Sequence, residues 1–150
     1  MRLLPKTSIY ALRAVLYMTS TGKKHKFVPL KRISEDLNIS FHFLTKIFQI
    51  LSRNGLMMSY RGPNGGVALA KPSSEIPLIE IITALEGTEF FEGCILALPR
   101  CGDEAPCPLH DYWRKMREEL KDMFEQTSVD ELGKKLKKDG LRLIASVELI

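Results

Sequence analysis

Apolar residues recur at helical spacing through the first forty residues and predict two helices there. The first covers residues 7–22, and Thr7 or Ser8 is its expected cap because a side-chain oxygen there can accept a free backbone N–H. The second is short and opens at Pro29 or just after. The apolar positions are Ile9, Leu12, Leu16 and Tyr17 in the first helix and Leu30, Ile33 and Leu37 in the second.

A tight connection, "NIS", leads into a third predicted helix over residues 41–54. Ser40 is its expected cap and Gly55 its expected stop, since serine caps helix starts and glycine follows helix ends. Its buried stripe is expected to hold Phe43, Leu44, Ile47, Phe48 and Leu51.

The pattern then changes to alternation, which is typical of strands. Leu56, Met58 and Tyr60 alternate before the turn-forming segment "RGPNGG", and Val67 and Leu69 alternate after it. This predicts a β-hairpin with a long basic tip. Three helices followed by a hairpin form a winged helix, a variant of the helix-turn-helix.

The second half of the chain is predicted to be helical around one irregular loop. A fourth helix opens at Pro77 and closes at Gly87. A long amphipathic helix covers residues 109–126, and a short helix follows the capping-box pair Ser128 and Glu131. The apolar side of the long helix holds Leu109, Tyr112, Trp113, Met116, Leu120, Met123 and Phe124. For the tail, residues 139–150, the sequence leaves three alternatives: a strand, part of a dimer contact, or partial disorder.

The expected fold is therefore mainly α with a small β-hairpin: a winged helix-turn-helix plus a long dimerisation helix. Residues 1–72 would form the winged helix-turn-helix region, and residues 73–150 the irregular loop and the dimerisation region of the same compact chain. The apolar stripe of the long helix is too large for an exposed helix on a small monomer, which favours a homodimer.

Charge divides the chain unevenly. Residues up to Lys71 hold twelve Lys or Arg against two acids, a net charge of +10, whereas the rest holds ten against sixteen, a net charge of −6. A solvated basic face would give the same excess, but in a helix-turn-helix setting it indicates a polyanionic partner. Lys6 and Arg13 interrupt the apolar N-terminus, and no apolar run has the roughly 18 residues of a membrane span. We therefore expect a cytoplasmic protein that makes no membrane contact.

Double-stranded promoter DNA is the expected partner, because the second helix of a helix-turn-helix enters the major groove. The polar outward positions of the third helix would reach bases and phosphates. Ser40, Phe41 and the nearby N–H groups would meet a phosphate at the helix start; the alternatives for Phe41 are that it packs on a thymine methyl or folds back onto the core. Arg61 at the wing is suited to a narrow minor groove. The candidate DNA-binding residues are Ser40, Phe41, His42, Thr45, Lys46, Gln49, Arg53, Arg61, Gly62, Pro63, Asn64 and Gly65.

All three cysteines lie in one Pro- and Gly-broken loop, with the spacing C-x6-C-x5-C-x2-H. Cys94, Cys101, Cys107 and His110 offer three thiolates and one imidazole, which suffice for tetrahedral zinc or for an iron–sulfur cluster. Structural zinc sites usually use close pairs such as C-x2-C, and this loop has only the C-x2-H pair. Three unligated thiols are the remaining alternative.

Several segments together resemble the Rrf-two family of bacterial winged-helix transcription regulators, in particular its IscR-like and NsrR-like members, which bind iron–sulfur clusters. They are "MRLLPKTSIYALRAVLYM", "VPLKRISEDLNIS", "LSRNGLMMSYRGPNGGVALAK" and "PLIEIITALEG", followed by the cysteines. The resemblance covers residues 1 to about 126 and implies homodimers that bind palindromic or semi-palindromic promoter DNA.

The resemblance further implies that Cys94, Cys101 and Cys107 ligate a cluster, with [2Fe–2S] favoured over [4Fe–4S]. "CPLH" places His110 where IscR-like members have their fourth ligand. Six residues separate the first two cysteines here, where IscR-like members have five. In some relatives the N-terminal helix of the partner subunit supplies the fourth ligand, but this chain offers only Thr7 and Ser8 there and no carboxylate.

The sequence thus predicts a DNA-binding transcriptional regulator that senses iron–sulfur status, redox state or nitric oxide through a cysteine-ligated cluster. The alternative is a zinc-stabilised or cofactor-free nucleic-acid-binding module with no sensing role. An enzyme is disfavoured, because no nucleophile–base pair, phosphate loop or paired-carboxylate site stands out in the sequence.

Overall fold

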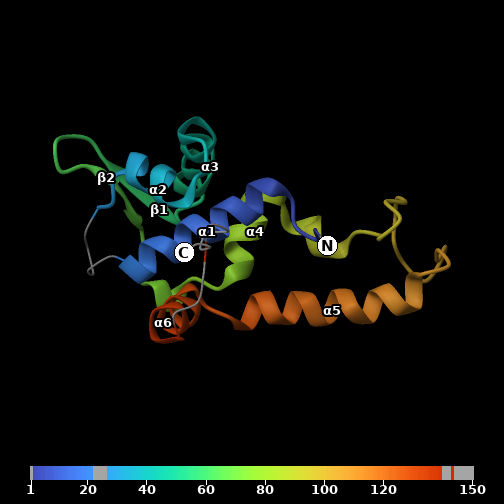
Figure 1. Cartoon of the computed structure of the whole chain (residues 1–150). Coiled ribbons are helices and arrows are strands. Elements are labelled where there is room, and N and C mark those ends of the chain that lie inside the picture. Colours follow the sequence, from blue (N-terminus) through green and yellow to red (C-terminus); the bar gives the residue numbers. More distant parts are fainter. Residues whose placement is uncertain (1, 22–26, 140–142, 144–150) are drawn as a thin grey trace.

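The computed structural model describes residues 2–21, 27–139 and 143 of the chain, so the predicted end of the first helix at Gly22 and nearly all of the tail lie outside the described residues. Within them the fold is helical, with one antiparallel hairpin (Figure 1). The helices are α1 (Lys6–Thr21), α2 (Leu30–Leu37), α3 (Phe41–Arg53), α4 (Leu78–Glu86), α5 (His110–Gln126) and α6 (Val129–Asp139). The strands are β1 (Met57–Tyr60) and β2 (Gly66–Leu69), and two short 3₁₀ helices are η1 (Ser73–Glu75) and η2 (Thr88–Glu92).

Local sequence signals set most of the helix ends. The Ser40 hydroxyl accepts a hydrogen bond from the Phe43 N–H at the start of α3, and Gly55 follows the helix with the left-handed φ of 74°. The Glu131 N–H likewise donates to the Ser128 hydroxyl at the start of α6. The predicted cap of α1 is wrong: the helix already begins at Lys6, and Ser8 lies inside it, fully buried, with its hydroxyl donating to Glu86 of α4.

The wing is a hairpin in which Met57 pairs with Leu69 and Tyr60 pairs with Gly66. Its buried residues at the start of β1 are the adjacent Leu56 and Met57, whereas Met58 and Tyr60 are exposed, so the alternation located the strand without marking its buried face. Val28 adds to the sheet through reciprocal backbone hydrogen bonds with Val67. The wing is therefore anchored to the segment that leads into α2.

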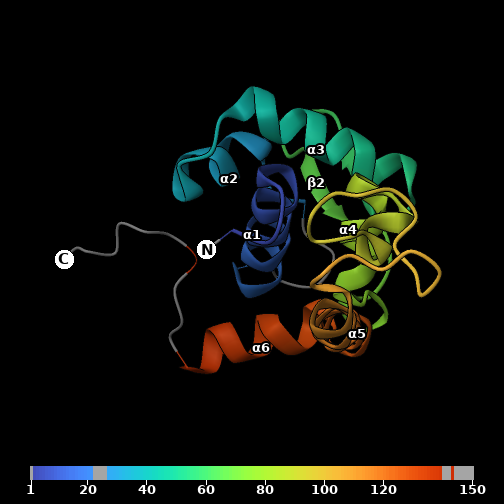
Figure 2. The same ribbon diagram turned by 90° about the vertical axis from the view of Figure 1, so that its right-hand side faces the viewer.

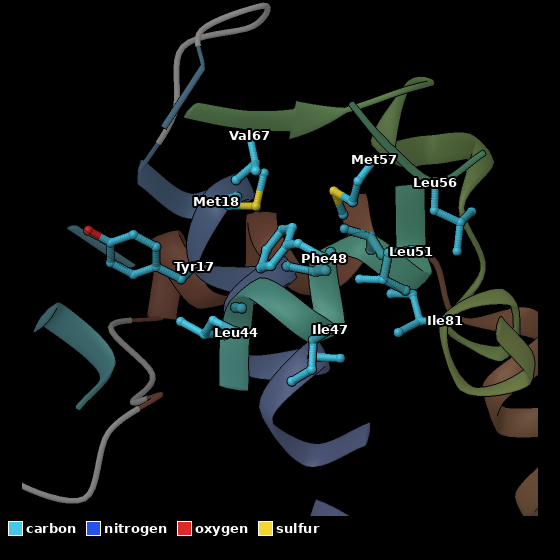
Figure 3. Packing of buried hydrophobic residues seen from close by; sticks show 14 of the residues in the cluster. Tyr17, Met18, Leu44, Ile47, Phe48, Leu51, Leu56, Met57, Val67 and Ile81 are labelled. Carbon is cyan, nitrogen blue, oxygen red and sulfur yellow. The ribbon is translucent and has the colours of Figure 1, made fainter. Parts of the chain in front are cut away.

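The core forms around α1, which packs against α2, α3, α4 and α6 (Figure 2). From α3, Leu44, Ile47, Phe48 and Leu51 are buried as predicted, while Phe43 is half-buried against the same cluster. Figure 3 shows the four buried side chains of α3 together with Tyr17 and Met18 of α1, residues of the wing and Ile81 of α4. This shared core fixes α3 and the wing relative to each other.

The long helix α5 extends away from the body, and the cysteine loop joins it at the end far from α6 (Figure 1). Only part of its predicted apolar stripe is left open: Phe124 is buried against Phe91, and Leu120 packs on the same core. The exposed part comprises Leu109, Tyr112, Met116 and Met123. Among the described residues, none of the helices has the length and apolar character needed to cross a bilayer.

Candidate nucleic-acid interface and cysteine loop

The outward face of α3 carries the residue types that the sequence predicted. Ser40, His42, Lys46, Gln49 and Arg53 are exposed. Phe41 is 52% exposed, so it does not fold back onto the core.

Thr45 is half-buried, and its hydroxyl donates to the Phe41 carbonyl at 2.8 Å. The hydroxyl proton of Thr45 is therefore engaged within the helix, which leaves the side-chain oxygen as an acceptor.

The wing tip depends on glycines for its shape. A Cβ at Gly65 would lie 2.2 Å from the Tyr60 carbonyl oxygen, and one at Gly66 would lie 2.2 Å from the Val28 carbonyl oxygen, so neither position admits a side chain without movement of the backbone. Arg61, Gly62, Pro63 and Asn64 are exposed around this tight turn. The glycines thus present a narrow tip with an arginine beside it.

The cysteine loop brings its four candidate donors together in pairs. Cys94 Sγ lies 3.6 Å from Cys107 Sγ, and Cys101 Sγ lies 3.6 Å from His110 Nδ1. All three thiols are free and half-buried. Within the described residues, His, Cys, Asp and Glu side chains form no set of three or more with metal-binding geometry.

Turns in the loop backbone set the positions of these donors. The Ala97 N–H donates to the Cys94 carbonyl, and the His110 N–H donates to the Cys107 carbonyl. Ala97 and Arg100 have left-handed φ angles of 59° and 57°, which reverse the chain between the first two cysteines.

His110 is the buried member of the group, at 4% exposure. Its Nε2 lies 3.1 Å from Asp103 Oδ1, which also accepts a hydrogen bond from Arg114 at 3.0 Å. A carboxylate on Nε2 favours the proton on that nitrogen and leaves the Nδ1 lone pair directed at Cys101. The ring is therefore oriented as a metal-ligating histidine usually is.

Two side chains of α5 hold the loop against the helix. Trp113 Nε1 donates to the Gly93 carbonyl at 2.9 Å. Arg117 Nη1 donates to the carbonyls of Glu92 and Gly93 and lies 3.4 Å from Cys101 Sγ. The residue before Cys94 is thus tied to α5 twice, and a guanidinium stands beside Cys101.

The thiol of Cys94 is also set apart electrostatically. Backbone N–H groups of Leu98 and then Leu96 donate to its sulfur and lower the pKa of Cys94 below that of an ordinary cysteine. The neighbouring Cys107 and Cys101 side chains lower the pKa of Cys94 further, while desolvation raises it. The lowered pKa makes the thiolate, the form in which cysteine binds metals, easier to reach at Cys94 than at an ordinary cysteine.

Sequence reasoning located the four donors but missed the groups around them. Asp103, Trp113 and Arg117 form the surroundings of the donor set, yet Asp103 and Arg117 look like ordinary surface charges in the sequence and Trp113 like part of a dimer stripe. The signal available in the sequence was position only: Asp103 lies inside the cysteine loop, and Trp113 and Arg117 are one helical turn apart.

Comparisons with known proteins identify the family of this chain. Residues 4–135 match the model of the Rrf2 family, described as an iron-dependent transcriptional regulator. The HTH-type transcriptional regulator IscR of Pectobacterium carotovorum is 34% identical over 129 residues, covering 82% of this chain and 74% of the relative.

Two solved structures share the fold. The structure of CymR, the global cysteine regulator of Bacillus subtilis, has a TM-score of 0.72 at 25% identity and covers 90% of this chain and 98% of its own. The structure of T. potens IscR has a TM-score of 0.73 at 21% identity, and the match covers 93% of this chain and 91% of that one. With most of its length matched by the family model and by a relative above 30% identity, this chain belongs to the Rrf2 family of DNA-binding transcriptional regulators and is not an enzyme.

Proposed function

We propose that this regulator binds double-stranded promoter DNA as a homodimer in the cytoplasm, and that an iron–sulfur cluster on Cys94, Cys101, Cys107 and His110 sets its DNA affinity. Residues 1–72 would bind DNA, and residues 73–150 would sense and dimerise. The signal would be iron–sulfur status, redox state or nitric oxide. The observation that carries the proposal is the pairwise approach of the four donors, with the buried histidine already oriented by a carboxylate.

The donor set fits such a group chemically. Thiolates and a neutral imidazole are the ligands that iron–sulfur clusters take from proteins. Two ligands about 2.3 Å from one tetrahedral metal lie about 3.8 Å apart, close to the 3.6 Å separation within each pair. Two donors per iron is the arrangement of a [2Fe–2S] cluster, which favours that type over [4Fe–4S]. When bound, the cluster would supply one-electron redox chemistry.

His110 is the best-supported fourth donor. Ser8, on the helix that donates a ligand in some relatives, is fully buried and gives its hydroxyl proton to Glu86. It would have to leave the core of its own subunit to reach a partner's loop. His110 needs no such movement, since its Nδ1 already lies 3.6 Å from Cys101 Sγ.

DNA recognition is supported by the exposed face of α3 and by the wing. His42, Lys46, Gln49 and Arg53 present hydrogen-bonding groups at the spacing of one helix face. Thr45, with its hydroxyl proton used inside the helix, would contribute through its oxygen or its methyl group. The wing residues Arg61 to Gly65 would lie along the sugar–phosphate backbone and the minor groove of the DNA.

Dimerisation is supported by the open side of α5. Tyr112 is 75% exposed, Met116 is 63% exposed and Met123 is 51% exposed, and they recur at helical spacing. A two-fold contact would cover this stripe and would match a palindromic operator.

Residues of this chain could link the loop to the dimer helix. Trp113 and Arg117 hydrogen-bond the segment before Cys94, so any ordering of the loop acts on α5. A bound group shifts a DNA equilibrium only by its different affinity for the two states of the protein. We expect the cluster-bound and cluster-free states to differ in how firmly the loop holds α5. That difference would change the spacing of the two α3 helices in the dimer.

A zinc-stabilised module without a sensing role is the second candidate. Three thiols and an oriented imidazole on one loop favour it, because three thiolates and one imidazole complete a tetrahedral zinc site. Purification without oxygen separates the two functions. Coloured protein containing iron and acid-labile sulfide is expected, whereas colourless protein with zinc would contradict the cluster.

Promoter binding by the loaded and metal-free forms, measured by fluorescence anisotropy, should then differ. Equal affinity of the two forms would leave a DNA-binding protein and remove the sensing role.

A further inference from the structure

Two of the three thiols stand in direct contact. Cys94 Sγ lies 3.6 Å from Cys107 Sγ, and both residues are half-buried on an exposed loop. We propose that Cys94 and Cys107 of the cluster-free protein form a reversible disulfide when a hydroperoxide oxidises them. The bond would block cluster loading until a thiol reduces it. Only the blocking of loading rests on the proposed function above.

The approach needed for the bond is short. A disulfide has an S–S length of about 2.05 Å, so the two sulfurs must close by about 1.6 Å. The intervening segment, residues 95–106, is mostly exposed, so small rotations about the side-chain bonds and of the loop can provide this. The neighbouring turns, Ala97 N–H to the Cys94 carbonyl and His110 N–H to the Cys107 carbonyl, can persist.

Cys101 is the competing partner, and its contacts hold it back. Its sulfur lies 3.4 Å from Arg117 Nη1 and 3.6 Å from His110 Nδ1, and Arg117 is itself fixed by the Glu92 carbonyl at 2.9 Å. Cys101 is thus attached to α5 by a charged donor. The Cys107 sulfur instead contacts that of Cys94, at 3.6 Å. The pair Cys94–Cys107 is therefore the expected product.

The chemistry balances with one hydroperoxide per bond. A thiolate of the pair attacks the peroxide O–O bond and becomes a sulfenic acid, and the leaving oxygen departs as an alkoxide or hydroxide that takes up a proton. The second thiolate attacks the sulfenic sulfur and forms the S–S bond, and hydroxide leaves and is protonated to water. The two thiols lose two electrons in total, and the peroxide gains them.

The bond would remove two of the four donors at once. A disulfide sulfur cannot serve as a thiolate ligand, so the oxidised loop keeps only Cys101 and His110 for a cluster. A thiol reductant would restore both thiolates by exchange through a mixed disulfide. The loop would then distinguish a chain that can be loaded from one that has been oxidised.

Peptide mapping tests the proposal on the full chain. Metal-free protein is prepared without oxygen, treated with a small excess of hydrogen peroxide, alkylated and digested by cleavage after Arg and Glu. Cleavage after Glu92, Arg100 and Glu104 puts each cysteine in its own peptide. The expected product joins residues 93–100 to residues 105–114 and leaves Cys101 alkylated. A bond that includes Cys101, a bond between chains, or three alkylated thiols would overturn the proposal.

Variants and a loading assay complete the test. Cys101→Ser should still form the bond, while Cys107→Ser should not. The oxidised wild-type chain should lose uptake of ferrous iron and sulfide, and dithiothreitol should restore it. Unchanged uptake by the oxidised chain would overturn the blocking role. Should the reduced chain take up no iron while the bond still forms, the cluster function fails and the disulfide site stands.

Discussion

Replacing Asp103 with alanine tests how the buried histidine is held. The Asp103 carboxylate accepts hydrogen bonds from His110 Nε2 at 3.1 Å and from Arg114 at 3.0 Å. Alanine removes the acceptor that orients the imidazole, so Nδ1 is no longer fixed toward Cys101. The expected result is a cluster that still forms but is lost faster.

The size of the effect follows from the exposure of the two partners. A hydrogen bond to a charged group contributes about 1.5–3 kcal/mol, and loss of an outer-shell partner typically weakens metal binding about 10- to 100-fold. Here His110 is 4% exposed but the Asp103 side chain is 78% exposed, so solvent screens the carboxylate. We therefore expect the lower end, about tenfold faster loss of iron, equivalent to roughly 1.4 kcal/mol.

The assay is the anaerobic transfer of iron from reconstituted protein to a chelator, followed by the decay of visible absorption. Glu104→Ala is the matched control, because it removes an adjacent exposed carboxylate of the same charge. His110→Ala gives the upper limit. Equal rates for wild type, Asp103→Ala and Glu104→Ala would show that the carboxylate does not orient the ligand.

Four further outcomes are expected. Arg61→Ala should weaken promoter binding by about 1–3 kcal/mol if the arginine enters the minor groove, and unchanged affinity at moderate salt would remove the wing from the interface. Met116→Glu, at a position 63% exposed on α5, should shift sedimentation from dimer to monomer without loss of helicity; a persistent dimer would place the contact elsewhere. A Cβ at Gly133 would lie 2.5 Å from a threonine hydroxyl of α1, so Gly133→Ala should lower the unfolding free energy by about 1–3 kcal/mol, and an unchanged denaturation midpoint would disprove the close packing of α1 on α6. Burial, and secondarily the hydrogen bond to Asp36, raises the pKa of Tyr17 above 10.0. Its stabilising contribution should therefore be complete below about pH 10 and fall as the pH rises further, and Tyr17→Phe should remove that part of the alkaline destabilisation.

Local physics in the sequence determined the helices, most of their ends and the wing. Ser40 accepts the Phe43 N–H, α4 runs between Pro77 and Gly87, and the buried stripe of α3 follows its periodicity. These features depend on hydrogen bonds and dihedral preferences within a few residues, which a sequence displays directly. The family followed from the same segments.

Long-range packing decided the rest. The sequence placed three cysteines and a histidine in one loop. Only the fold showed that Cys94 contacts Cys107, and that Arg117 of α5 lies beside the thiol of Cys101. Ser8 is a candidate cap of α1 by sequence, but in the structure it is buried and its hydroxyl donates to Glu86 of α4. Burial against a distant helix here outweighs a local capping preference. Such contacts join positions far apart in sequence, and their energy comes from burying surfaces that no local pattern specifies. For that reason the sequence identified the four candidate donors, whereas the residues around them could be identified only in the tertiary structure.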